Sequence, residues 1–198
     1  MTFAEMVEEV EGYGFSYEPT DRIERWLQIA YQKLNNEQVW PWSEASKEGK
    51  APLEIKDVSR VLSVTDSTQE RPLWGVKRQW LLENFPKLDE EGNPVWWFLD
   101  NLTLRTFPLS EDNVVVRYAS KAPELKAEDE GLVPEEWQSL VVELAVIEGY
   151  KRNSNIAAAS EMKEIVDEGI NDMIGDVLQR DLQSAPLVTR TGLPWDYL

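Results

Sequence analysis

The sequence contains neither cysteine nor histidine, and these two absences narrow its possible chemistry. Without cysteine the chain has no disulfide, thiolate metal site or cysteine nucleophile. Without histidine it lacks the commonest general base, the commonest metal ligand and every Ser-His-Asp arrangement. Catalysis would have to rely on carboxylates, lysine or tyrosine, none of which stands in a distinctive motif. We therefore expect a protein that is not an enzyme, with no catalytic residues, metal site or cofactor.

Positive charge is also scarce. The chain has 20 lysines and arginines against 37 aspartates and glutamates, which gives a net charge of −17. Such a surface repels phosphate, and no run of basic residues stands out as a local exception. We therefore expect no tight, direct binding of DNA or RNA. The simplest interpretation of the acidity is that it keeps the protein soluble.

Long apolar runs are missing as well. No run approaches the ~20 residues of a membrane span, so we expect no membrane contact. The N-terminal segment MTFAEMVEEVEG carries glutamates and no early lysine or arginine, unlike a secretory signal. These features favour a protein that works in the cytoplasm where it is made, or in a particle assembled there. Its 198 residues, 42% of them apolar, suffice for one substantial domain or at most two small ones.

Helical periodicity dominates both ends of the chain. Phe3, Met6, Val7 and Val10 have the i, i+3, i+4, i+7 spacing of one face of a helix. Trp26 and Tyr31 lie on a second apolar stripe, where both are expected in the core. Further on, Pro134 stands where a helix begins, followed by two glutamates that suit the positive end of the helix dipole. The predicted helices span residues 3–11, 21–36, 134–152 and 156–182.

The middle of the chain has the pattern of strands. Residues 58–65 alternate with period 2 and predict one strand. Three further runs, 95–99, 102–105 and 114–118, are separated by turn residues and predict a small antiparallel β-meander. Residues 43–51 are predicted to be a polar loop, and residues 73–85 a short helix ended by Pro86.

The run VWWFL, residues 95–99, does not alternate apolar with polar side chains. A sheet with one face in water alternates, so both faces of this strand are expected to be covered. Helices of the same chain or a neighbouring subunit can supply the cover. Trp96, Trp97 and Phe98 are therefore candidate residues for a protein contact.

Two segments look like ligand-binding loops and are rejected on their spacing. Gly49-Lys50 lacks the glycine that a phosphate-binding loop carries five residues earlier, since Glu44 stands there. The acidic segment 89–93 lacks the alternating Asp/Asn ligands and the distal glutamate of a calcium loop. A solvated hairpin turn accounts for it.

The last segment, residues 184–198, has apolar and aromatic residues but no periodicity. Terminal segments are more often frayed and polar, so this arm is expected to dock. It either packs on its own domain or adds to the sheet edge or groove of a partner. Its candidate contact residues are Leu187, Val188, Leu193, Trp195, Tyr197 and Leu198.

Three other functions remain open at this point. A glycosidase needs two acids in a cleft, but the acids here are spread over helix faces and loops. A tryptophan-rich carbohydrate-binding module, or another non-catalytic binding module, has better support from Trp40, Trp42, Trp96 and Trp97, although the helical ends argue against an all-β module. A nucleic-acid mimic suits the net charge, but lysines and arginines are interleaved with the acids.

The order of these elements resembles the head–tail adaptor (connector or neck) proteins of tailed double-stranded DNA bacteriophages. A Tyr-small-Pro passage, Tyr118 to Pro123, closes the strand region before the last two helices, as it often does in that family. The segments that carry the resemblance are RIERWLQIAYQKLNNEQVWPW, VVVRYASKAPEL, LVPEEWQSLVVELAVIEGYKRN and the long helix from Ile156.

Patterns and resemblance together predict an α+β fold that is mainly α. It comprises a helical bundle with an inserted small antiparallel β-meander, and an extended C-terminal arm. The adaptor-like domain is expected over residues 1–183, with a β-rich insertion at about 52–120, and the arm over 184–198.

The resemblance also implies a role. Such proteins form a ring in the virion neck, commonly of twelve copies, that joins the portal protein to a downstream neck or tail protein and extends the DNA channel. The DNA passes through without specific binding, and the ring catalyses no reaction. The chain would then be made in the cytoplasm of the bacterial host and reside in the virion, between capsid and tail. An acidic channel wall would let DNA slide, and apolar strands covered on both faces would suit contacts in a ring.

Overall fold

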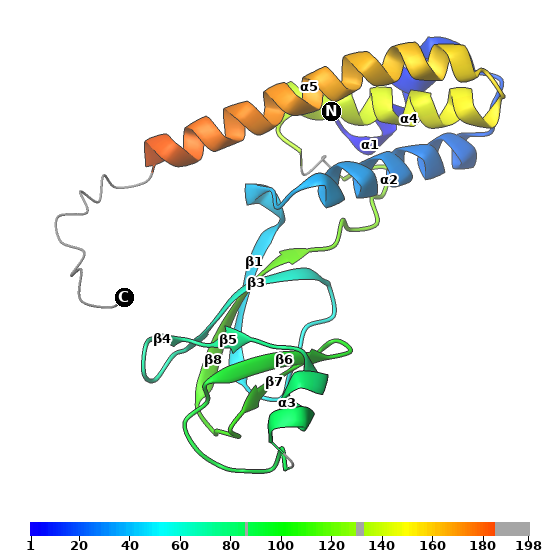
Figure 1. The fold of residues 1–198 in the computed structure, drawn as a ribbon. Helices are drawn as coiled ribbons and strands as arrows, with labels where there is room; N and C mark the ends of the chain where they lie inside the picture. The colour runs from blue at the N-terminus through cyan, green and yellow to red at the C-terminus, as the bar shows by residue number, and fades with distance from the viewer. Residues whose placement is uncertain (86, 130–132, 185–198) are drawn as a thin grey trace. The chain divides into compact units, whose positions relative to one another are not determined.

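The computed structural model describes residues 1–85, 87–129 and 133–184 (Figure 1). The chain divides into two compact units. The helical unit comprises Met1–Ala30 and the chain from Ala127 onward, and the β unit comprises Tyr31–Lys126. Helices account for 48% of the structure and strands for 24%. The fold is therefore a mixed α and β fold, with more β structure than the predicted meander supplies.

The helical unit begins with α1 (Phe3–Val10). Thr2 and Glu5 form a capping box at its start, and the four apolar residues of the predicted face are buried. The chain does not leave helical geometry directly after α1, although the predicted helix ends at residue 11. It continues as a π-helical turn, Glu11–Phe15, and leaves helical geometry at Gly14, whose φ of 96° suits glycine best. Helix α2 (Thr20–Glu37) follows and runs past Ala30 into the β unit, and Trp26 and Tyr31 are buried as predicted.

The other two long helices, α4 (Gln138–Arg152) and α5 (Ile156–Ser184), form an antiparallel pair (Figure 1). Pro134 is not the first residue of α4 as predicted. It precedes a 3-10 turn, Glu135–Trp137, from which α4 continues. Small residues let the two helices approach, because Ala159 is buried against α4 and a Cβ on Gly169 would lie 2.6 Å from Leu140 Cδ2.

The β unit contains two four-stranded sheets. The strand order of the first sheet is β1 (Glu44–Lys50), β8 (Asn113–Ser120), β3 (Val58–Asp66) and β4 (Arg71–Pro72). The order of the second is β2 (Leu53–Glu54), β7 (Thr103–Phe107), β6 (Trp96–Asp100) and β5 (Trp74–Gly75). The short helix α3 (Arg78–Asn84) lies between β5 and β6 in the sequence.

The prediction of a single meander was wrong. Strands β6 and β7 form the expected antiparallel hairpin, with Trp96 opposite Phe107, but β8 does not pair with β7. It pairs antiparallel with both β1 and β3 in the first sheet. There Val114, Val116 and Tyr118 bury their side chains together with Val58 and Val64. Burial against a distant strand decides this pairing, and the local turn pattern does not contain that information.

Residues 43–51 are not a loop, so the β structure begins before the predicted 52. Strand β1 pairs with β8 from Glu44 to Lys50. Its sequence EASKEGK has no apolar alternation because β1 is an edge strand whose side chains are exposed or only half-buried. Charged residues are common on such edges, where they oppose aggregation. The helix predicted over 73–85 is also shorter than expected, because Trp74–Gly75 pairs in parallel with β6.

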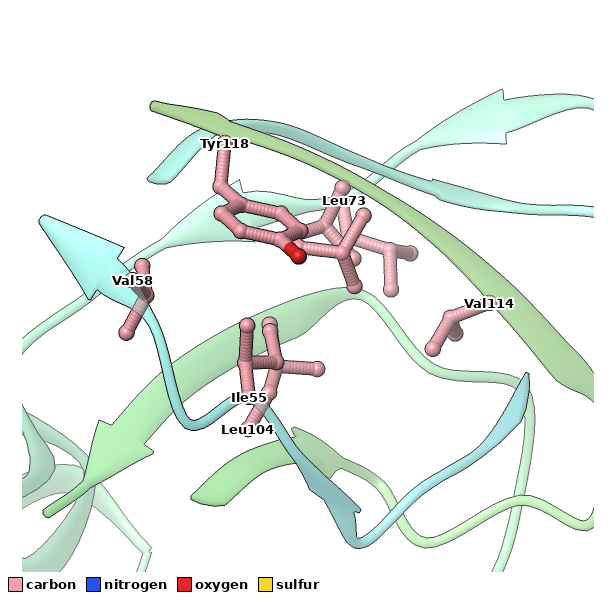
Figure 2. Close-up of a cluster of buried hydrophobic side chains, with 8 residues drawn as sticks. Ile55, Val58, Leu73, Leu104, Val114 and Tyr118 are labelled. Carbon is pink, nitrogen blue, oxygen red and sulfur yellow. The ribbon is translucent and has the colours of Figure 1, made fainter. Parts of the chain in front are cut away.

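The core of the β unit lies between its two sheets. Figure 2 shows the gathered side chains, to which β8 contributes Val114 and Tyr118 and β7 contributes Leu104. The buried residues of this cluster are Ile55, Val58, Val64, Leu73, Leu104, Val114, Val116 and Tyr118. In the segment before β1, the indole of the fully buried Trp40 donates a hydrogen bond to the Leu34 carbonyl at 2.7 Å. That bond holds the WPW segment back against the end of α2, and Trp42 stacks on Trp40 at 4.8 Å.

Candidate interaction surfaces

Strand β6, which carries Trp96, Trp97 and Phe98, is packed on both faces by its own unit. Trp97 packs against the core between the sheets. Trp96 packs on the other side against the cluster of Leu81, Phe98 and Phe107, to which α3 contributes Leu81. The expectation that both faces are covered is therefore confirmed, and elements of the same chain supply the cover. Leu99, at the end of the run, stays 36% exposed.

The three sheet residues differ in their availability to a partner. Phe98 is only 4% exposed and belongs to the core. Trp96 and Trp97 are half-buried, so each keeps some surface. Trp97 lies over Gly75 of β5, where a Cβ would be 2.7 Å from the indole ring. That close approach accounts for glycine at this position, and a protein contact through Trp96 and Trp97 stays a prediction.

An aromatic cluster surrounds Trp96. Its ring centroid lies 5.1 Å from Phe85, 6.0 Å from Phe107 and 6.0 Å from Trp80. Phe85 also lies 4.9 Å from Phe107. Tilted and offset arrangements at these distances are favourable for aromatic pairs. The cluster fixes α3 against the second sheet.

The exposed rim of this cluster was missed by the sequence reasoning. Trp74 in β5 is 69% exposed, and Trp80 and Leu82 in α3 are also exposed. We call these three residues the tryptophan rim. Large apolar side chains exposed on neighbouring segments of the chain are candidates for a protein contact. The segment LWGVKRQWLL held the signal, but the prediction of one continuous helix hid which side chains face water.

The predicted arm residues lie outside the described residues. This applies to Leu187, Val188, Leu193, Trp195, Tyr197 and Leu198. Their docking on a partner therefore stays a prediction.

Acidic side chains lie along the outer face of α5. Glu161, Glu164 and Glu168 are exposed and share one side of the helix, because residues three, four and seven apart are neighbours on its surface. Two other acids of α5 pair with bases, Asp167 with Lys163 and Asp176 with Arg180. Within the described part of the chain, no such partner faces the first three. We call Glu161, Glu164 and Glu168 the glutamate ridge.

The half-buried Glu143 and the buried Tyr118 have shifted pKa values. Burial, and then the negative charge of Glu9, raises the pKa of the Glu143 carboxyl in α4. Burial, and then the nearby Asp57 carboxylate, raises the pKa of the Tyr118 phenol. Both shifts therefore have a structural cause in burial and in a neighbouring carboxylate.

The described residues contain neither a metal-binding cluster nor a membrane-spanning helix. Across residues 1–85, 87–129 and 133–184, no group of three or more acidic side chains is placed to hold a metal ion. In that same part of the chain no helix combines the length and apolar character needed to cross a membrane.

Comparison with known proteins identifies the family. No curated protein matches the chain. The model of the SU10 adaptor protein family, however, matches residues 1–190, which include both units and the beginning of the arm. The match confirms the resemblance to phage head–tail adaptors. The chain therefore belongs to the SU10 adaptor protein family, whose members are structural proteins of bacteriophage particles.

Proposed function

We propose that this protein forms a ring in the neck of a tailed bacteriophage, where it joins the portal protein to the next neck or tail protein. The observation that carries the proposal is the adaptor family match over nearly the whole chain. In this assignment the protein catalyses no reaction, and its work is to hold other virion proteins in place. The ring contains twelve copies, and DNA passes through its centre.

The division into two units supports this role. A ring adaptor needs one surface for its neighbours, one for the portal and one for the tail. The helical bundle of this chain and its two-sheet β unit are each compact and have separate cores. We assign the contacts between neighbouring copies in the ring to the helical unit. We assign the contacts along the ring axis, with the portal and with the next neck or tail protein, to the β unit and the arm; these are the axial contacts.

Two features of the chain suit the axial contacts. The tryptophan rim gives an apolar surface on α3 and β5, with Trp96 beneath it. Tryptophan is enriched among the residues that dominate binding energy in protein interfaces. The arm, residues 184–198, adds further apolar residues and binds a groove or sheet edge of the portal protein.

The net charge supports passage of DNA. With a charge of −17 per copy, a ring of these chains repels the phosphate backbone instead of retaining it. The prediction is that acidic side chains, and not lysine or arginine, line the channel. A reconstruction in which the acids face outward would contradict a role of the acidic surface in the passage of DNA.

A pull-down with assembled portal rings tests the axial assignment. Deletion of residues 186–198 should weaken binding to portal rings, and the substitutions Trp74→Ala and Trp80→Ala should weaken binding to portal or to the next neck protein. Arg60→Ala, on an exposed side of β3, is a matched control that should leave binding unchanged. If both the deletion and the double substitution bind as the unaltered chain does, neither surface has the proposed role.

A further inference from the structure

A pocket in the helical unit gathers three arginines in a protein that is otherwise strongly acidic. Its volume is about 350 Å³. Helix α2 supplies Arg22, Arg25, Trp26 and Ile29, and the C-terminal end of α4 supplies Arg152 and Asn153. Since all of these residues belong to the helical unit, the pocket is a feature of that unit alone. We call it the arginine pocket.

The charges in this pocket are only partly compensated. Arg22 forms an ion pair of 2.6 Å with Glu18, whose buried carboxylate also accepts a hydrogen bond from Asn153 at 3.3 Å. Arg25 and Arg152 are exposed, and no ion pair with another described residue neutralises either of them. Three guanidinium groups and one carboxylate leave a net charge of +2 in a chain of net charge −17.

Packing beneath the pocket fixes its position. Trp26 is 3% exposed, and its ring meets Phe15 edge to face at 5.3 Å. A Cβ on Gly149 of α4 would lie 2.8 Å from both rings, so glycine lets α2 come close to α4 at this point. The arginines therefore project from a rigid junction and not from a loop. A preorganised site loses less entropy on binding.

Guanidinium groups grouped in this way bind carboxylate or phosphate oxygens, often in pairs. Phosphate of DNA is disfavoured here, because the charge of the whole chain repels it. A carboxylate carried by a protein with apolar side chains is favoured, because Trp26 and Ile29 give the pocket an apolar floor. The glutamate ridge on α5, with the 65% exposed Ile165 beside it, has this chemistry.

The pocket and the ridge lie on opposite sides of the helical unit. Helix α4 contacts α5 through Leu140 and Ile147 and contacts α2 through Gly149. Gly149 follows Ile147 by two residues, which is a rotation of about 200° around a helix. Helices α2 and α5 therefore flank α4 from opposite sides (Figure 1). A pocket on one side and its complement on the other is the arrangement of a head-to-tail contact that closes into a ring.

We propose that the arginine pocket of one copy receives the glutamate ridge of a second copy of this chain. Arg25 and Arg152 bind the carboxylates of Glu164 and Glu168, while Ile165 packs against Ile29. The inference rests on the proposed ring, for which it supplies the neighbour contact. It also explains how copies of net charge −17 associate, since each contact joins a local positive site to a local negative one.

Charge reversal tests the contact. The pocket variant carries Arg25→Glu and Arg152→Glu, and the ridge variant carries Glu164→Arg and Glu168→Arg. Each alone should self-associate on the order of a hundredfold more weakly than the unaltered chain, because like charges then face each other. An equimolar mixture should regain association, since every contact in an alternating assembly is again complementary. Arg60→Glu with Arg78→Glu, two exposed arginines of the β unit, is the control for net charge.

A second measurement applies even to a weakly associating free protein. Arg25→Lys keeps the positive charge and adds an amine, which a zero-length carbodiimide couples to a carboxylate in direct contact. Mixed heavy- and light-isotope protein should then give cross-links between position 25 of one copy and Glu164 or Glu168 of the other. Circular dichroism and melting temperature establish that each variant is folded.

The outcomes separate this inference from the proposed neck function. If the variants associate like the control and no mixed-isotope cross-link to α5 forms, the contact is refuted, even where imaging places the protein in the neck. If the mixture recovers association but the protein is absent from the neck, the contact stands and the proposed function fails. Protection of the pocket arginines by short duplex DNA, with no effect of ridge substitutions, would mean a phosphate ligand and would overturn the inference.

Discussion

Gly149→Ala is the substitution that tests most directly how the helical unit is held together. In a helix interior alanine is favoured over glycine by about 1 kcal/mol. At position 149, however, the new Cβ would lie 2.8 Å from Phe15 Cζ and 2.8 Å from Trp26 Cζ3. Both rings are buried, so neither has free space into which to move. Overpacking of this kind costs about 1–3 kcal/mol, and we expect a net change in unfolding free energy from near zero to about 2 kcal/mol destabilising.

Two other glycines, Gly169 and Gly175, both in α5, provide matched controls for Gly149 in α4. A Cβ at Gly175 meets nothing within 4 Å, so Gly175→Ala should stabilise the chain by about 1 kcal/mol. A Cβ at Gly169 meets only the end of the Leu140 side chain, which can rotate, so Gly169→Ala should fall between the two. Thermal unfolding followed by circular dichroism at the helix band measures all three. The melting temperatures should rank Gly175→Ala highest and Gly149→Ala lowest.

The result that would refute this reasoning is equal stabilisation by all three substitutions. Helix propensity alone would then decide the outcome, and α2 would not be held against α4 by the contact of Phe15 and Trp26 with Gly149. The rigid position of the arginine pocket depends on that contact. A destabilised but folded Gly149→Ala variant should accordingly also associate more weakly with other copies.

Three further predictions concern single side chains. Trp40→Phe removes the buried indole hydrogen bond to the Leu34 carbonyl and should cost about 1–3 kcal/mol in urea unfolding, whereas an unchanged midpoint would contradict the role given to that bond. Because the folded-state pKa of Glu143 is raised above its ordinary value of 4.5, its ionisation destabilises the fold as pH rises through that raised pKa. Glu143→Gln should therefore raise the melting temperature at neutral pH and lose this advantage in acid below about pH 4, and a constant difference across pH would refute the assignment. Trp74→Ala should leave the melting temperature within about 2 °C of the unaltered chain, because its side chain is 69% exposed, and a larger fall would place it in the core.

The helices could be predicted from the sequence because their signal is local. Phe3, Met6, Val7 and Val10 define a face within two turns, and all four are buried. The helix predicted over 156–182 is observed as Ile156–Ser184 for a similar reason, since Val166 and Met173 repeat at the helical spacing. Such patterns report burial on one side of an element without reference to the rest of the chain.

The sheets could be predicted only in part, because strand partners are decided by distant contacts. Strand β1 carries charged side chains and pairs with β8 more than sixty residues later, so its own residues give little sign of it. The hairpin of β6 and β7 was predicted because Asp100-Asn101 makes a local turn between them. The assignment of β8 to a different sheet depends on the burial of Val116 and Tyr118 together with Val58. No local sequence pattern indicates that these distant residues pack together.

The candidate surfaces, like the helices and sheets, could be predicted where the signal is local and not where it depends on distant contacts. The non-alternating run at Trp96–Phe98 indicated cover on both faces, which is correct, but the source of the cover could not be chosen from the sequence. The arginine pocket was missed because Arg25 and Arg152 are far apart in the sequence. A search for runs of basic residues finds no cluster, whereas the packing of α2 against α4 creates one.

Imaging the neck of assembled particles is the most direct test of the adaptor role. Cryo-electron microscopy should show a ring of this chain between portal and tail, with the glutamate ridge of each copy in the arginine pocket of the next. Density between portal and tail that is fully accounted for by other proteins, with this chain absent or elsewhere in the particle, would contradict the account.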